Sequence, residues 1–242
     1  MNNVIDLSET NSALGNYARS FIVQVYGWMV LGLFVTFMSA FGVMFLIDTN
    51  AVFANLLYNS IGLLFLLEIA IVIILSLFWR KFNGFISLGM FMLYALINGL
   101  FFGVLMYAYT LDSLLVAFAA TFLTFGVMAV YGYFTKSDLS KIGSIAIMGL
   151  FGLVIGSIIN LIITFTNPGF GQGLYWILTY VGLAIFIILV AYDTQRLKML
   201  ANQAEQNGGS MMSYSIQGAL MLYLDFINIF IRVLAITGKR RR

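Results

Sequence analysis

Seven long apolar runs fill most of this 242-residue chain and limit what it can fold into. A helix needs about 20 predominantly apolar residues to cross the hydrocarbon core of a bilayer. The connections between the runs are short, so consecutive helices are expected to be antiparallel neighbours. The sequence therefore predicts an all-α polytopic membrane protein with a single transmembrane domain. The predicted spans are residues 21–47, 56–78, 85–109, 114–134, 142–165, 174–192 and 214–236.

The composition agrees with a membrane protein. Hydrophobic residues make up 62% of the chain and charged residues 9%, whereas soluble domains average about 45–50% and about 25%. The first apolar run is too long for the core of a cleaved signal peptide, so we expect it to remain as a span. Residues 1–19 are expected to form a polar N-terminus, and residues 237–242 form a basic tail.

Basic residues in the short connections predict the orientation of the chain. They follow spans two, four and six and are absent after spans one, three and five; the positions are Arg80, Lys81, Lys136, Lys141, Arg196 and Lys198. Cytoplasmic loops carry an excess of such residues. We therefore expect a multi-pass protein of a plasma (inner) membrane with a cytoplasmic N-terminus. After seven crossings the basic tail would lie outside, against this rule; either the last run does not cross fully or the tail is an exception, and we expect seven crossings.

The chain contains neither cysteine nor histidine. The absence of cysteine excludes disulfides and thiolate metal sites. The absence of histidine excludes the side chain that most often transfers protons near neutral pH. Any proton chemistry must therefore use carboxylates. No cofactor is expected. No nucleic-acid partner is expected either, because the basic tail is better explained as an anchor at lipid headgroups. A retinal-type photoreceptor is excluded because no predicted span holds the lysine that retinal requires.

Two aspartates interrupt the last two apolar runs. Asp193 lies near the end of span six and Asp225 lies within span seven. Ionisable residues inside spans are rare and often mark ion or proton paths. If helix six continues past Asp193, as Leu197 and Leu200 suggest, the two acids lie roughly 10 and 15 Å from the same end of the helical hairpin. The sequence therefore predicts that the two carboxyl groups meet inside the membrane.

A buried carboxyl pair offers a specific chemistry. Two nearby carboxylates cannot both ionise at low cost, so the pair is expected to share a proton and to titrate as a unit. With the proton, the pair can clamp helices six and seven together; without it, the pair repels itself or binds a cation. Calcium prefers 6–8 oxygen ligands, so a site with Asp193 and Asp225 would be weak and hydrated, which suits permeation. Calcium and protons are therefore the expected partners.

Other polar residues could modify this pair or make it merely structural. Asp225, Asn228 and Arg232 share one helix face, which predicts that helix seven is enclosed by the other six. Arg196 and Arg232 could instead neutralise Asp193 and Asp225 in static ion pairs.

Two further features of the predicted spans allow more than one reading. Glu68 in span two could join the same polar interior or make one hydrogen bond to a neighbouring helix. Small residues at helical spacing predict close helix packing, with a pore lining as the alternative; they are Gly99 and Gly103, and Gly149, Gly152 and Gly156 with Asn160.

The residues around the two acids resemble a known family. The segments Ala191-Tyr192-Asp193-Thr194-Gln195 and Leu222-Tyr223-Leu224-Asp225-Phe226-Ile227-Asn228 are similar to motifs of the Bax inhibitor family, specifically its bacterial branch. This resemblance implies a pH-sensitive calcium leak channel in which Asp193 and Asp225 form the sensor. It also implies that Arg80 acts as a latch and that six helices enclose the seventh. Some bacterial relatives modulate a membrane-bound, ATP-dependent protease, so a non-conducting modulator is the alternative.

An intramembrane aspartyl protease is a further alternative, because it also uses two aspartates on neighbouring spans. The chain lacks the glycines of the protease pattern Gly-x-Gly-Asp before Asp225, and it has no Pro-Ala-Leu motif. The motif match therefore lacks its context, and no enzymatic activity is expected.

Overall fold

In a computed structural model the protein is almost entirely helical. The structure describes residues 7–78, 82–206 and 210–241. Over this part of the chain there are seven helices, and strand-like pairing is limited to one isolated bridge between Tyr109 and Arg240. The helices are α1 (Leu7–Thr49), α2 (Ala51–Phe78), α3 (Gly84–Tyr107), α4 (Leu111–Phe134), α5 (Ser140–Thr166), α6 (Pro168–Gln206) and α7 (Met211–Thr237).

Most of these helices are able to cross a membrane. Among the described residues, six helices are long and apolar enough to span it, and α2 is the seventh if its two parts count as one span. Those parts, Ala51–Ser60 and Gly62–Leu75, are bent by 49°. The chain is therefore an all-α polytopic membrane protein, as its apolar runs predicted.

The helices differ from the apolar runs mainly in length. α1 begins well before the predicted start at Phe21, and α6 runs from Pro168 to Gln206 instead of ending near Tyr192. Both extensions carry polar residues, and a helix can continue into water because its backbone hydrogen bonds do not depend on lipid. α6 continues past Asp193 in the structure. The prediction that the two acids meet depends on this continuation.

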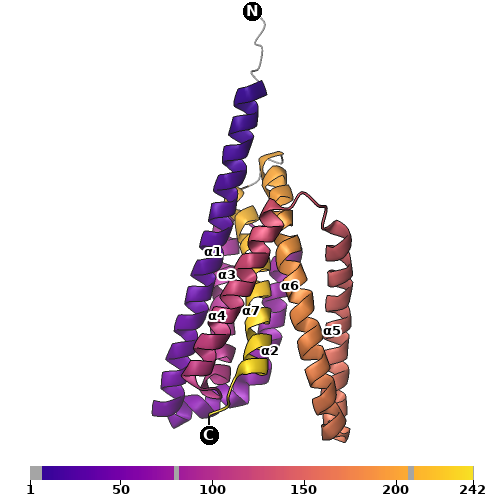
Figure 1. Ribbon diagram of the computed structural model, residues 1–242. Coiled ribbons are helices and arrows are strands. Elements are labelled where there is room, and N and C mark those ends of the chain that lie inside the picture. The colour runs from indigo at the N-terminus through magenta and orange to yellow at the C-terminus, as the bar shows by residue number, and fades with distance from the viewer. Residues whose placement is uncertain (1–6, 79–81, 207–209, 242) are drawn as a thin grey trace, which may run out of the picture. The chain divides into compact units, whose positions relative to one another are not determined.

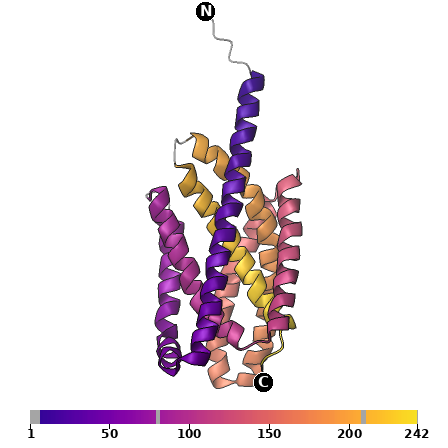
Figure 2. The same ribbon diagram turned by 90° about the vertical axis from the view of Figure 1, so that its left-hand side faces the viewer.

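The chain divides into two compact units. Unit 1 contains residues up to Leu105 and residues Leu197–Met221, and unit 2 contains residues Met106–Arg196 and Leu222–Arg242. α6 and α7 thus contribute to both units. Figure 2 shows α1 of unit 1 as the long indigo helix with α2 and α3 beside it.

In unit 1, α1 and α3 approach closely because small residues lie between them. A Cβ atom on Gly99 would overlap Ser39, and one on Gly103 would also overlap α1. The hydroxyl of Thr36 donates a hydrogen bond of 2.9 Å across the interface to the carbonyl oxygen of Ala95. The packing interpretation of the two glycines is therefore correct.

In unit 2, α5 and α6 form an antiparallel hairpin (Figure 1). Gly156 faces Leu178 across this hairpin, and Gly149 faces Ile185. These two glycines also serve helix packing, whereas a Cβ atom on Gly152 would meet nothing within 4 Å. Close packing thus explains part of the predicted glycine series and leaves Gly152 without a structural reason.

α7 is the most protected helix of the chain. No residue from Met211 to Ile236 is exposed, although the helix carries Asp225, Asn228 and Arg232. Its polar side chains are thus kept from lipid, as a spanning helix requires. The arrangement of six helices around α7 stays a prediction.

The C-terminal tail follows α7 and pairs with the connection between α3 and α4. The backbone N–H of Thr110 donates to the carbonyl oxygen of Lys239 at 3.1 Å, and that of Arg241 donates to Ala108 at 2.9 Å. The N–H of Lys239 donates to the Ser113 hydroxyl at 2.9 Å. The tail therefore lies at the start of α4, whereas Lys136 follows the other end of that helix.

Candidate functional site

Asp193 and Asp225 come together within unit 2. Their side chains are hydrogen-bonded to each other, Asp193 from α6 and Asp225 from α7. A carboxylate only accepts hydrogen bonds, so one of the two groups carries a proton when this bond is formed. The structure thus joins the two acids that the depth argument had placed together.

The two acids have different surroundings. Asp225 is only 3% exposed, whereas Asp193 is partly exposed. Arg196, one turn after Asp193, lies close enough for the two opposite charges to interact. The Oδ2 atom of Asp225 is buried and has no hydrogen-bond partner among the described residues. A buried oxygen of this kind needs a proton, a water molecule or a cation.

The chemistry open to this pair is limited by its small number of ligands. The described residues contain no group of three or more acidic, histidine or cysteine side chains that could hold a metal ion. A calcium ion at this site would thus have two carboxyl groups and would take its remaining oxygens from water or backbone carbonyls. Such a site would hold a divalent cation weakly.

The residue that follows Asp225 belongs to an aromatic cluster. Phe226, the residue after Asp225, makes edge contacts with Phe118 and Phe125 of α4 at centroid distances of 5.9 and 5.6 Å. Phe226 itself is only 2% exposed. These contacts pack α7 against α4 within unit 2.

Gln195 is a site residue for which sequence reasoning gave no role. Its side-chain oxygen accepts a hydrogen bond of 2.9 Å from the backbone N–H of Leu139, and its side-chain nitrogen donates one of 2.8 Å to the carbonyl oxygen of Ser137. Both partners belong to the connection between α4 and α5. No signal in the spacing of residues pointed to these contacts.

Among the described residues, Arg232 forms no ion pair with Asp225. Its guanidinium lies over the ring of Phe186 at 5.0 Å, in space left by Gly182, where a Cβ atom would overlap it. Its Nε atom is buried and has no hydrogen-bond partner among the described residues. Asn228 bonds within its own helix, donating to the carbonyl oxygen of Leu224 at 2.9 Å.

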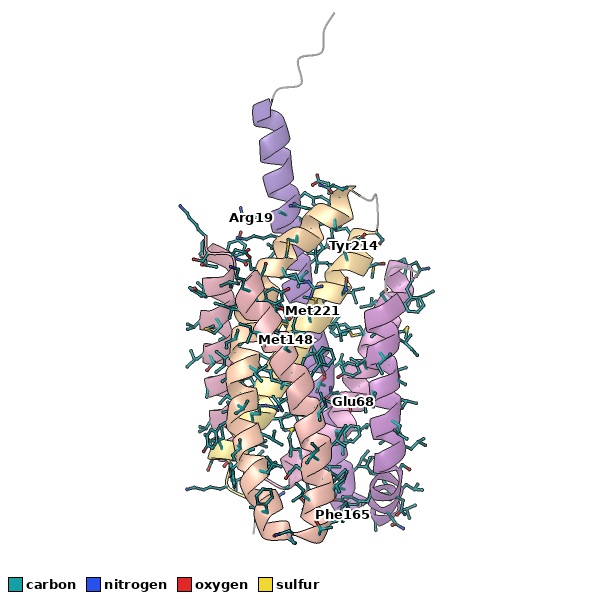
Figure 3. All side chains as sticks on the ribbon, turned by 90° about the vertical axis from the view of Figure 1, so that its right-hand side faces the viewer. Arg19, Glu68, Met148, Phe165, Tyr214 and Met221 are labelled. Carbon is teal, nitrogen blue, oxygen red and sulfur yellow. The ribbon has the colours of Figure 1, made fainter. Side chains whose placement is uncertain are left out.

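Glu68 and Arg80 are the remaining predicted residues. Glu68, labelled on α2 in Figure 3, is partly buried in unit 1 and hydrogen-bonded to Tyr94 of α3. This contact matches the alternative in which Glu68 bonds to a neighbouring helix. A role beside Asp193 and Asp225 stays a prediction. Arg80, the predicted latch, lies outside the described residues.

Comparisons with known proteins match nearly the whole chain. The model of a family described as "Inhibitor of apoptosis-promoting Bax1" matches residues 18–242. The inner membrane protein YbhL of Escherichia coli (strain K12) is 38% identical over 226 residues, which cover 92% of this chain and 93% of that protein. A protein of Deinococcus radiodurans is 35% identical over 222 residues, covering 92% and 91%. A protein of Borreliella burgdorferi is 29% identical over 240 residues, covering 98% and 99%. The chain therefore belongs to the Bax inhibitor family.

Proposed function

We propose that this protein is a calcium leak channel whose opening depends on pH and whose gate is the Asp193–Asp225 pair. The observation that carries the proposal is the hydrogen bond between two carboxyl groups on adjacent helices of a membrane protein. Neither acid has a further acidic, histidine or cysteine group beside it with which it could form a metal cluster among the described residues. The pair is thus suited to exchange a proton and to bind a cation weakly.

The proposed gate follows from the charge of the pair. With one proton, Asp193 and Asp225 hold α6 and α7 together. When that proton is lost, two unit charges about 4 Å apart repel each other by about 4 kcal/mol at an effective dielectric constant of about 20. A calcium ion entering between them relieves this repulsion, and its departure is easy because the site supplies few ligands. We therefore expect the leak to increase as the pH rises.

The orientation is part of the proposal. The relatives include a protein named as an inner membrane protein, and Lys136 and Lys141 follow α4 at the end opposite the C-terminal tail. The excess of basic residues in the even-numbered connections supports a cytoplasmic N-terminus. The Asp193–Asp225 pair then lies nearer the cytoplasmic end of α6, where it would respond to cytoplasmic pH.

Calcium flux into liposomes tests the gate. In Asp225→Asn the neutral amide can still hydrogen-bond to Asp193, but the pair can no longer carry two negative charges. We expect the leak at alkaline pH to fall by at least about tenfold, a modest share of the repulsion given above, and its dependence on pH to flatten. The measurement is the rate of calcium entry, reported by a dye inside the liposomes, across a pH series.

Asp112→Asn is the matched control, because Asp112 is an exposed acid in the first turn of α4. It should leave the leak and its pH profile unchanged. If Asp193→Asn and Asp225→Asn both behave like this control, the pair is not the gate. A protein that conducts no calcium but keeps its cellular role after Asp225→Asn would favour the alternative of a protease modulator.

A further inference from the structure

The turn of α6 that carries Asp193 is held by the elements preceding it in unit 2. A Cβ atom on Gly132 of α4 would overlap the backbone of Ala191, and one on Gly143 of α5 would overlap the ring of Tyr192. These two glycines therefore allow α4 and α5 to touch the α6 backbone and ring directly. The turn has almost no freedom to shift toward either helix while these contacts persist.

Gln195 adds a polar anchor to the same turn. It satisfies one donor and one acceptor of the α4–α5 connection at once, at 2.9 Å from Leu139 and 2.8 Å from Ser137. Leu139 is the residue before the first turn of α5, where backbone N–H groups have no partner within the helix. The amide oxygen of Gln195, two residues from Asp193, thus supplies the hydrogen-bond acceptor that the start of α5 lacks.

A groove of about 180 Å³ borders this connection and is lined by Leu139, Ala191 and Tyr192 among others. The two hydrogen bonds of Gln195 therefore add a polar attachment between the α4–α5 connection and α6 to the glycine packing contacts.

We propose that Gln195 is a positioning residue, which ties the α4–α5 connection to α6 and thereby holds the carboxyl group of Asp193 against Asp225. Two observations carry this inference: the paired hydrogen bonds of one amide, and the direct glycine contacts that bring α4 and α5 to the same turn. Its effect on calcium leak rests on the proposed function, whereas its effect on position does not.

Two substitutions separate the effect of the Gln195 hydrogen bonds from that of side-chain packing. Gln195→Met keeps the length of the side chain and removes both hydrogen bonds. Gln195→Glu keeps the acceptor for the N–H of Leu139 and loses the donor to Ser137, so it should rescue part of the effect. Asn202→Met, an exposed position on the same helix, is the control.

The first measurement follows the connection itself. The chain has no cysteine, so Lys136→Cys supplies a unique, exposed attachment point for a spin label. Gln195→Met should make this label clearly more mobile, Gln195→Glu should have an intermediate effect, and Asn202→Met should have none. Equal mobility in all backgrounds would overturn the anchor.

The second measurement follows the position of Asp193 and needs no calcium flux. In a protein with Asp193→Cys and Asp225→Cys, the rate of disulfide formation on mild oxidation reports how often the two side chains meet. Gln195→Met should slow this reaction several-fold, and Gln195→Glu should slow it less. An unchanged rate, or a failure to form the disulfide while Gln195 is present, would overturn the positioning role.

A third measurement, the calcium leak, tests whether the position of Asp193 affects the proposed gate. We expect Gln195→Met in the otherwise native chain to raise the leak at acidic pH about tenfold, since two hydrogen bonds of ordinary strength are lost. A native protein without any calcium leak would refute the proposed function, and the label and disulfide measurements would still decide the role of Gln195. A leak that responds to Asp225→Asn but is unaffected by Gln195→Met would overturn the positioning role.

Discussion

Asp193 and Asp225 share one site but stabilise a negative charge unequally. Asp193 is partly exposed and has Arg196 nearby, whereas Asp225 is almost completely buried beside Asp193. Burial disfavours a charge, and a nearby opposite charge favours it. When the pair holds a single proton, the arrangement with the charge on Asp193 and the proton on Asp225 is therefore the better one.

A third acid, Asp138, titrates at acidic pH and not near neutral pH. It lies fully exposed in the α4–α5 connection, and hydrogen bonds from the hydroxyl and N–H of Ser140 lower its pKa from the usual value of 3.8. A lowered pKa in the folded state adds stability above the unfolded pKa, and this stability is lost as the pH falls through the folded value. The stability difference between the native protein and Asp138→Asn should thus be constant at neutral pH and should shrink only in strong acid.

Thermal unfolding in detergent across a pH series measures this difference. If Asp138→Asn changed the pH profile of the calcium leak near neutrality, the connection and not the buried pair would contain the sensor.

The sequence predicted the residues whose chemistry conflicts with their surroundings. A carboxyl group in an apolar run is costly, so Asp193 and Asp225 were recognisable without coordinates. Gln195 was not, because glutamine near a helix end is ordinary and its partners are backbone atoms 56 and 58 residues away in the chain. Contacts to a loop backbone leave no pattern in the composition of either segment.

α7 packs against α6 through the shape of its surface as well as through polar groups. The guanidinium of Arg232 occupies the space left by Gly182 and rests on Phe186. The sequence placed Arg232 on the face of Asp225 but could not show that α6 provides its surroundings. That pairing depends on the lateral position of two long helices, which apolar periodicity does not specify.

A methyl group at Gly182 tests this packing. In Gly182→Ala the new Cβ atom would overlap the Nε atom of Arg232, so the guanidinium must move. We expect Gly182→Ala to be about 1 kcal/mol less stable than Gly152→Ala, the low end for overpacking because a long side chain can shift, measured by thermal or denaturant unfolding in detergent. Gly152→Ala is the control, because a Cβ atom there meets nothing within 4 Å. Equal stability of both variants would contradict the assigned contact.

The number and approximate places of the spans follow from the length of the apolar runs. The ends of α1 and α6 do not, since a helix can continue into water without an apolar signal. The position of the basic tail also required the structure, because its pairing with the α3–α4 connection uses backbone groups. The tail thus sits at the opposite end of α4 from Lys136.

The sidedness of the chain can be measured directly. Lys136→Cys and Lys239→Cys each add a single thiol at an exposed position of a cysteine-free chain. A membrane-impermeant maleimide applied to intact cells should label Lys239→Cys and should reach Lys136→Cys only after the membrane is opened. Labelling of both from the same side would show that α7 does not cross fully, and the reverse pattern would place the N-terminus outside.

The backbone pairing of the tail also bears on how the protein can be handled. Ala108 and Thr110 hold the chain just behind α7 as short bridges of main-chain atoms. A purification tag or fluorescent fusion joined directly behind Arg242 would therefore be attached next to this pairing at the start of α4, where Ser113 also binds the tail. A flexible spacer, or a tag placed at the other terminus, leaves those bridges undisturbed.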